Sequence, residues 1–142
     1  MTIVVDASVA AKWLFEETDS AKARLLLTEI ERGRFESLAP EILPAEIANS
    51  LSKRVFRGLL EPVEAEAQYQ RFRQACPALI SNGTLAESAL HLALRRRHSF
   101  YDCLYVALAL EIACDLLTAD EKLYRAFSPI FPQVRLLRDW PV

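Results

Sequence analysis

The stretch Thr2-Ile3-Val4-Val5-Asp6-Ala7-Ser8 places an acidic residue directly after an apolar, mostly β-branched run. Such residues favour strands, and an uninterrupted apolar run is typical of a strand buried on both faces, as in a parallel sheet. Asp6 then lies where this strand gives way to a helix. The stretch therefore predicts a central strand with a carboxylate at its carboxyl end.

The rest of the chain alternates between strand and helix signals. We expect strands at residues 2–5, 35–39, 78–80, 115–118 and 134–137. We expect helices at residues 8–16, 19–32, 41–57, 62–75, 85–97, 101–113 and 120–127, with a turn at residues 81–83. Strict alternation without a repeat or a low-complexity linker indicates the α/β class. The prediction is a single domain, residues 1–142, folded as a three-layer α/β/α sandwich around a mostly parallel central sheet.

Composition narrows the class of protein. The chain has 142 residues, of which 52% are hydrophobic, enough for one domain with a sizeable core. No apolar stretch approaches the roughly 20 residues that a membrane span needs, and Met1 leads directly into the first strand. We therefore expect a soluble, unprocessed protein of the cytoplasm, with no membrane partner. The formal net charge of -2 gives no overall attraction for nucleic acid, so RNA would need a local basic patch.

The cysteines and histidines do not suggest a metal site. Cys76, Cys103 and Cys114 are odd in number and lack C-x-x-C spacing, so we expect small, buried side chains in a reducing compartment. His91 and His98 have no partner at ligand spacing. We expect both to be structural or surface residues.

Four acidic residues lie at predicted strand ends or on predicted helices. Asp6 and Asp120 fall at strand-to-helix junctions, where parallel sheets form sites but where an acid also caps the next helix. Asp102 lies in the first turn of a helix that is otherwise apolar except for Glu111, and a carboxylate there is costly unless it is paired or bound to a cation, although it could also cap the helix. Glu46, taken alone, is an ordinary solvated residue. If the sheet gathers all four, their repulsion calls for an oxygen-preferring ion such as Mg²⁺ or Mn²⁺.

Four segments resemble, in order, the successive motifs of PIN domains. They are Val5-Asp6-Ala7-Ser8, Glu46-Ile47-Ala48-Asn49-Ser50-Leu51, Tyr101-Asp102-Cys103-Leu104-Tyr105-Val106-Ala107-Leu108-Ala109 and Leu117-Thr118-Ala119-Asp120-Glu121-Lys122-Leu123. Size and gap lengths are most similar to the VapC toxins of toxin–antitoxin modules. The resemblance covers nearly the whole chain and departs at Cys103, where alanine is common.

This resemblance implies a metal-dependent endoribonuclease. It assigns catalysis and metal binding to Asp6, Glu46, Asp102 and Asp120, with Mg²⁺ as the cofactor and Mn²⁺ as a substitute. It also implies that Ser8 and Thr118 lie close by and that Asn49 supports Glu46. In phosphodiester hydrolysis of this kind, metal ions activate water and stabilise charge on the phosphate, so neither a histidine nor a protein nucleophile is required.

The resemblance also implies partners. Family members bind an RNA substrate, usually form homodimers, and are neutralised by a cognate antitoxin. Apolar residues on the helices at 20–27 and 62–72 suggest an interface. Possible RNA contacts are Lys53, Arg54, Arg57, Arg95 and Arg96. An alternative explanation is that these basic residues are solvated and lie near helix ends because positive charge there complements the helix dipole.

Two other functions stay open at this point. One is a phosphoryl-accepting α/β domain, such as a receiver or a haloacid-dehalogenase-type phosphatase, which also sets an aspartate after its first strand. Against it, residue 8 is serine and Lys122 lies at a helix start. The other is a catalytically inactive PIN-fold module that binds RNA or serves as a scaffold.

Overall fold

A five-stranded parallel sheet forms the centre of the computed structural model, which describes residues 1–142. Its strands are β1 (Thr2–Val5), β2 (Glu36–Pro40), β3 (Ala78–Ile80), β4 (Asp115–Thr118) and β5 (Val134–Leu136). They lie in the order β3-β2-β1-β4-β5, and every neighbouring pair is parallel. The predicted α/β class is confirmed, and the sheet is parallel throughout rather than in most of its pairs.

The strand order reverses beside β1. Val4 of β1 pairs with Leu38 of β2 on one side and with Leu116 of β4 on the other. The chain first builds outward from β1 to β2 and β3, and then returns to the opposite side of β1 to add β4 and β5. In open parallel sheets, ligands bind outside the carboxyl ends of the strands at such a reversal. The carboxyl ends of β1 and β4 are therefore the expected place for a site.

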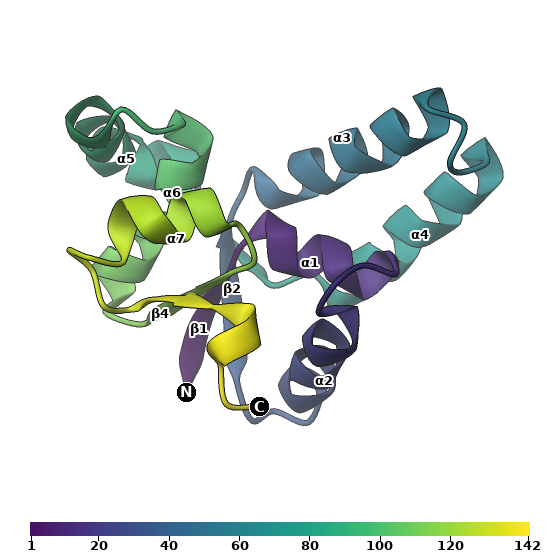
Figure 1. The fold of residues 1–142 in the computed structure, drawn as a ribbon, viewed down its shortest axis with the longest axis horizontal. Helices are drawn as coiled ribbons and strands as arrows, with labels where there is room; N and C mark the ends of the chain where they lie inside the picture. Colours follow the sequence, from purple (N-terminus) through teal and green to yellow (C-terminus); the bar gives the residue numbers. More distant parts are fainter.

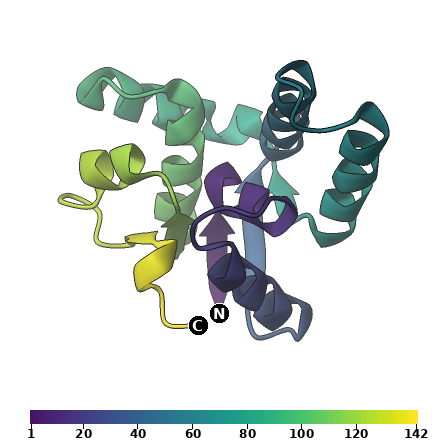
Figure 2. The same cartoon turned by 45° about the vertical axis from the view of Figure 1, so that its right-hand side comes forward.

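Helices cover both faces of the sheet. They are α1 (Ala7–Leu14), α2 (Ser20–Glu31), α3 (Leu43–Phe56), α4 (Pro62–Ala75), α5 (Asn82–Arg96), α6 (Phe100–Ile112) and α7 (Glu121–Phe127), followed by a 3₁₀ helix, η1 (Leu137–Asp139). Helix α6 packs on β1, β2 and β4 with α5 outside it, while α1 and α2 lie on the other face (Figures 1 and 2). This arrangement confirms the predicted three layers.

The largest departure from the predicted bounds is at the start of α5. Residues 81–83, expected as a turn before a helix at 85, instead form the cap and first residues of α5, because the Ser81 hydroxyl accepts a hydrogen bond from the Gly83 backbone N–H at 3.2 Å. The last strand, expected through residue 137, ends at Leu136 because Leu137 already begins η1. The other elements lie within two residues of their predicted bounds.

The core fills both faces of the sheet, and its most continuous part lies between the sheet and α6. Residues 103–109 of α6 are all buried, as are residues 3–5 of β1, which agrees with the apolar runs of the sequence. Phe15, Phe72 and Trp140 belong to the same core. All three cysteines are free, but only Cys103 is buried; Cys76 and Cys114 are partly exposed because each lies at a helix end, so the expectation of three buried cysteines is wrong.

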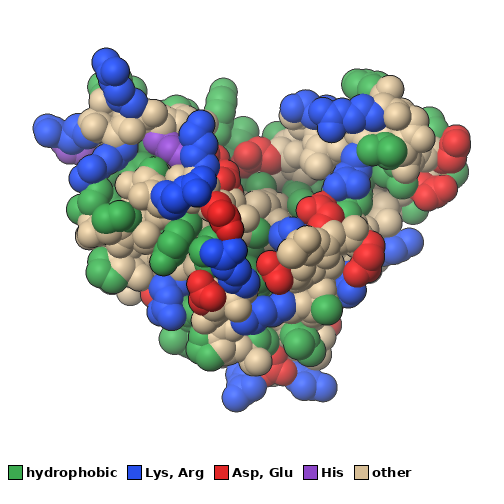
Figure 3. Space-filling view, in the orientation of Figure 1, with side chains coloured by type: hydrophobic (Ala, Val, Ile, Leu, Met, Phe, Trp, Pro, Cys, Tyr) green, Lys and Arg blue, Asp and Glu red, His purple; other side chains and the backbone are tan.

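The molecule opens at the carboxyl ends of the strands. In Figure 1 the hairpin of α3 and α4 projects on one side of this opening and α5 with α6 on the other, while both chain termini lie at the opposite end. Figure 3 shows a hollow between the two lobes. No helix has both the length and the apolar content that crossing a membrane requires.

Candidate metal centre

Asp6 lies at the reversal of the sheet. Its backbone N–H donates to the Leu117 carbonyl at 3.0 Å, which continues the pairing of β1 with β4 past the last strand residue. The side chain is only 4% exposed, and its Oδ2 accepts hydrogen bonds from Ser8 Oγ at 2.5 Å and Thr118 Oγ1 at 2.9 Å. It makes no side-chain cap bond to α1. The capping role considered for Asp6 is therefore wrong, because the two hydroxyls hold the carboxylate instead.

The same hydroxyls tie Asp6 to the loop that follows β4. Ser8 Oγ accepts from the Ala119 N–H at 2.9 Å, and Thr118 Oγ1 accepts from the Asp120 N–H at 3.0 Å. Ser8 and Thr118 therefore lie beside Asp6, as the resemblance implied. They join the ends of β1 and β4 into one unit that positions two acidic residues.

Asp120 is the N-cap of α7. Its Oδ1 accepts hydrogen bonds from the backbone N–H groups of Lys122 at 2.9 Å and Leu123 at 3.3 Å, which satisfies two free donors of the helix. The capping role considered for this residue is confirmed. The cap uses only one carboxylate oxygen, so it leaves Oδ2 available for a second role.

Glu46 is fixed by a residue that the sequence did not single out. It lies in the first turn of α3, and its Oε1 accepts a hydrogen bond from Tyr105 OH at 2.7 Å. Tyr105 is fully buried in α6, and the sequence pattern indicated only that it belongs to the apolar surface of that helix. The available signal was its position three residues after Asp102, which places both side chains on one face of α6.

Asp102 is fixed by His98. In the first turn of α6, Asp102 Oδ2 lies 2.8 Å from His98 Nε2. The His98 side chain is 6% exposed, and its ring packs edge-on against Phe127 of α7 with the centroids 5.3 Å apart. The expectation that His98 is structural is correct, although its partner is a candidate site residue. The four-residue spacing to Asp102 was the signal in the sequence.

One oxygen of each carboxylate has no hydrogen-bond partner in the protein. Asp6, Glu46, Asp102 and Asp120 are each held through the other oxygen, as described above. These four oxygens are not enclosed in the protein, since none of them is among the buried polar atoms that lack a hydrogen-bond partner. Each can therefore reach solvent or a cation without giving up the bond that orients it. These free oxygens are Oδ1 of Asp6, Oε2 of Glu46, Oδ1 of Asp102 and Oδ2 of Asp120.

The charges of the four groups act on one another. Burial raises the pKa of Asp6 to about 6; its hydrogen bonds to Ser8 and Thr118 lower the value, and the nearby charges of Asp102 and Asp120 raise it. Burial likewise raises the pKa of Glu46 to about 7, opposed by the bond from Tyr105 and reinforced by Asp6 and Asp102. The site thus resists holding all of its negative charge without a cation.

The donor set suits a hard divalent cation. No three His, Cys, Asp or Glu side chains are arranged as a ready-made cage. Mg²⁺ does not need one, since it usually keeps several waters and takes one or two carboxylates together with substrate phosphate oxygens. Free carboxylate oxygens in an acidic, partly buried site are what such an ion prefers. The residues therefore fit Mg²⁺ or Mn²⁺.

The residues predicted to contact RNA are not equally available. Lys53, Arg57, Arg95 and Arg96 are exposed and make no ion pair. Arg54, in contrast, pairs with Glu17 at 2.8 Å and lies over the Phe15 ring at 3.5 Å. Figure 3 shows basic side chains on both lobes and acidic ones in the hollow between them.

Asn49 does not support Glu46 through a hydrogen bond. Its side chain is exposed and has no hydrogen-bond partner, while its backbone carbonyl accepts from Ser52 Oγ at 2.9 Å. It nevertheless lines the same small pocket as Glu46. The resemblance implied that Asn49 supports Glu46, but the structure contains no hydrogen bond between the two side chains.

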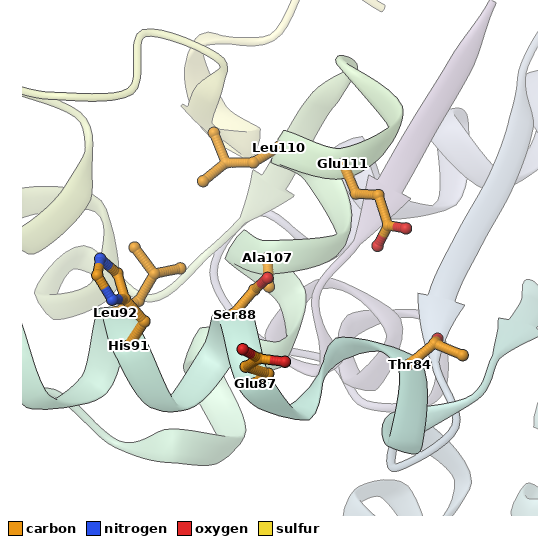
Figure 4. Close-up of a pocket in the computed structure, with 8 residues that line it drawn as sticks. All are labelled: Thr84, Glu87, Ser88, His91, Leu92, Ala107, Leu110 and Glu111. Atoms are coloured by element: carbon orange, nitrogen blue, oxygen red, sulfur yellow. The ribbon is translucent and has the colours of Figure 1, made fainter.

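A larger pocket lies away from the carboxylates, between α5 and α6. It has a volume of about 680 Å³, and Figure 4 shows the side chains of His91, Glu87 and Glu111 spread along it rather than turned toward one point. His91 is exposed there, as expected for a surface residue. This pocket does not resemble a metal site.

Comparison with known proteins identifies relatives over most of the chain. The family model for the PIN domain matches residues 3–127. The chain is 33% identical over 132 residues to Ribonuclease VapC3 of Pyrobaculum aerophilum, covering 92% of this chain and 98% of that one. It is 36% identical over 106 residues to Ribonuclease VapC1 of Mycobacterium tuberculosis, covering 72% and 75%. The crystal structure of PAE2754 from Pyrobaculum aerophilum superposes with a TM-score of 0.72 at 19% identity, covering 97% and 93% of the two chains.

Proposed function

On the premise that this chain belongs to the PIN-domain family and is of the VapC type, we propose that it is a Mg²⁺-dependent endoribonuclease, the toxin of a toxin–antitoxin module. Nuclease activity itself follows from the family and from the names of its relatives. The observation that carries the metal dependence is the group of four carboxylates at the reversal of the sheet, each with a free oxygen.

The residues that would hold the metal are Asp6, Glu46, Asp102 and Asp120, one or two of them directly and the others through the waters that Mg²⁺ keeps. When bound, Mg²⁺ supplies a Lewis acid that lowers the pKa of water and neutralises charge on the phosphate. The protein contributes preorganisation, because Ser8 and Thr118 orient Asp6 while Tyr105 and His98 orient the acids of α3 and α6.

RNA has to approach an acidic site on an acidic protein. Lys53 and Arg57 at the end of α3, and Arg95 and Arg96 at the end of α5, are exposed and make no ion pair, so they are free to contact phosphates. Arg54 is the weakest member of the predicted set, because its ion pair with Glu17 would have to be shared or broken. We propose that the other four basic residues guide the RNA backbone into the hollow.

The proposed partners are a cognate antitoxin and a second copy of the chain. An apolar groove of about 680 Å³ runs between α3 and α4, and Phe56 and Val63 on its walls are 82% and 74% exposed. Leu25 of α2 is also 58% exposed. Apolar surface of this extent supports a protein interface in a molecule of this size. The proposed place of action is the cytoplasm, where RNA substrates and the antitoxin are made.

Cleavage of RNA by the purified protein tests the proposal. Structured RNA should be cut in the presence of Mg²⁺ or Mn²⁺, and cutting should stop on addition of a chelator. In Asp102→Asn, cleavage should be lost while the circular dichroism spectrum of the folded chain is retained. Metal-independent cleavage, or full cleavage by Asp102→Asn, would contradict the assignment.

Neither alternative function gains support from the structure. The phosphoryl-accepting domain is disfavoured by membership of the PIN family and because Ser8, at the position where a phosphatase needs a second acid, donates a hydrogen bond to Asp6. An inactive PIN-fold module has no need for four carboxylates that each keep a free oxygen. A protein that bound no Mn²⁺ and cut no RNA would favour that module.

A further inference from the structure

A small pocket adjoins the carboxylates on the α3 side. It has a volume of about 270 Å³ and is lined by Ile42, Ala45, Glu46, Asn49 and Tyr101. This is close to the lower end of the roughly 300–1,000 Å³ of small-molecule sites. Glu46 belongs both to this pocket and to the candidate metal centre, so an occupant of the pocket would lie directly beside that centre.

Tyr101 forms an exposed aromatic wall of this pocket. It precedes Asp102 in the first turn of α6, and it is 56% exposed, unlike the seven buried residues that follow at 103–109. Its ring packs edge-on against Phe100 at a centroid distance of 5.7 Å and an interplanar angle of 73°. The ring therefore has a neighbour that restrains it and a surface that is open to solvent.

The α3 side of the pocket carries an unused amide. The side chain of Asn49 is exposed and has no hydrogen-bond partner in the protein. The start of α3 is fixed by the bond from the Ile42 N–H to Asn82 Oδ1 at 3.2 Å, so this wall is part of a tethered helix. Lys53 lies four residues after Asn49 on the same face of α3, Arg57 is the C-cap of the helix, and both are exposed.

We propose that this pocket receives an unpaired nucleobase of the RNA, next to the phosphodiester bond that is cleaved. The base stacks on Tyr101, and the amide of Asn49 hydrogen-bonds to its edge. The inference rests on the proposed nuclease function and adds to it a site that selects the base beside the cut.

The chemistry of the walls favours a base over other occupants. A planar ring can stack on Tyr101, an amide both donates and accepts hydrogen bonds, and the cations farther along α3 attract the phosphates of the same strand. Proteins that bind single-stranded RNA combine stacked aromatic residues with a basic track in this way. An apolar side chain of a protein partner would leave the amide of Asn49 unused.

The test is a binding measurement with a fluorescent RNA. The probe is a short, unstructured RNA carrying 2-aminopurine, an adenine analogue whose emission falls when its ring stacks. Binding is measured with Mg²⁺ in full-length Asp120→Asn, where the asparagine carbonyl keeps the cap on α7 while one site carboxylate is removed to prevent cleavage. Recovery of intact probe after each titration verifies that no cleavage has occurred.

Substitutions of Tyr101 in that background give opposite expectations. Tyr101→Phe keeps the ring and should keep the parental Kd and the loss of emission. Tyr101→Ala should raise Kd about 5- to 150-fold, the equivalent of one lost base–aromatic stack, and abolish the change in emission. Leu90→Ala is the matched control, because Leu90 is 51% exposed on α5 and lines no part of this pocket; it should behave as the parent.

Two results would overturn the inference. One is a Tyr101→Ala protein whose Kd and change in emission equal those of the parent protein, which is the result expected if the pocket binds a protein partner instead of a base. The other is a parent protein that shows no loss of emission with the probe. Cleavage by protein with Asp120 intact is scored separately: stacking without cleavage would contradict only the nuclease, and cleavage without stacking would contradict only the pocket.

Discussion

The imidazole Nε2 of His98 lies 2.8 Å from Oδ2 of Asp102, while the same ring packs edge-on against Phe127 of α7. The histidine thereby connects the start of α6 with the helix that Asp120 caps. Groups that hydrogen-bond to a metal ligand fix its orientation, and their loss typically costs 10- to 100-fold in metal affinity. His98 is thus a positioning residue for the proposed centre.

His98→Ala should weaken Mn²⁺ binding about 10- to 100-fold, because Asp102 loses the donor that orients it. His98→Gln should recover part of this loss, since its amide N–H can reach toward the same oxygen. Isothermal titration with Mn²⁺ measures both. Equal affinity in wild type and His98→Ala would show that the bond does not position the ligand.

Tyr105→Phe should shift the pH dependence of cleavage toward higher pH. The Tyr105 hydroxyl donates to Glu46 and lowers its pKa, so removing that donor raises the pKa of Glu46 above about 7. A larger fraction of Glu46 is then protonated at neutral pH, where Mg²⁺ has to compete with the proton. The measurement is kcat/KM against pH at fixed Mg²⁺; a profile identical to that of wild type would contradict the role of Tyr105.

Asp6→Asn should stabilise the protein when a chelator is present. The folded-state pKa of Asp6 is raised from 3.8 to about 6, so between these values the folded chain binds more protons than the unfolded chain. Stability from this group is therefore present at low pH and lost as the pH rises from about 4 to about 6 and above. At pH 7.5 the variant should gain on the order of 1–3 kcal/mol in free energy of unfolding, and the gain should shrink toward pH 4.

Urea denaturation of both proteins in chelator measures that difference. Ser8 and Thr118 can still donate to the asparagine carbonyl, so the comparison isolates the charge. If Asp6→Asn is less stable than wild type at pH 7.5, the claim that burial and nearby negative charges make ionised Asp6 destabilising is contradicted.

The double variant Arg95→Ala, Arg96→Ala should bind RNA more weakly and with a flatter dependence on salt. Each lost contact to a single-stranded phosphate reduces the slope of log K against log salt by about 0.7. Fluorescence anisotropy with a labelled single-stranded RNA, between about 50 and 200 mM salt, gives the slope. Arg34→Ala is the control, because Arg34 pairs with Glu29 just before the amino end of β2, away from the hollow. Equal slopes in the double variant and the control would remove Arg95 and Arg96 from the RNA path.

The sequence predicted the parts of the site that depend on local signals. The apolar run that ends at Asp6 marks a buried strand, and the switch from strand to helix pattern at Asp120 marks a junction, so both acids could be placed at strand ends. Because the strands of the sheet are parallel, their carboxyl ends lie at the same edge, and both acids are therefore expected there. The α6 helix was equally clear because its apolar residues run without a break from 103 to 109.

The contacts that orient the acids could not be predicted in this way. Tyr105 and Glu46 are 59 positions apart, and their bond depends on how α3 and α6 pack across the end of the sheet. Asp6 had the sequence position of a helix cap, yet its hydrogen bonds come from Ser8 and from Thr118, which is 112 positions away. The partial exposure of Tyr101 is likewise a product of packing, since Phe100 before it and residues 103–109 after Asp102 are apolar.

Titration of the full-length protein with Mn²⁺ tests the proposed metal centre most directly, in parallel with Asp6→Asn and Asp102→Asn. Wild type should bind Mn²⁺ with release of protons at pH 6.5, because the raised pKa values of Asp6 and Glu46 leave both partly protonated there. Both variants should lose most of that binding while remaining folded. Mn²⁺ binding of wild-type strength in either variant, or none in wild type, would contradict the assignment of these carboxylates as metal ligands.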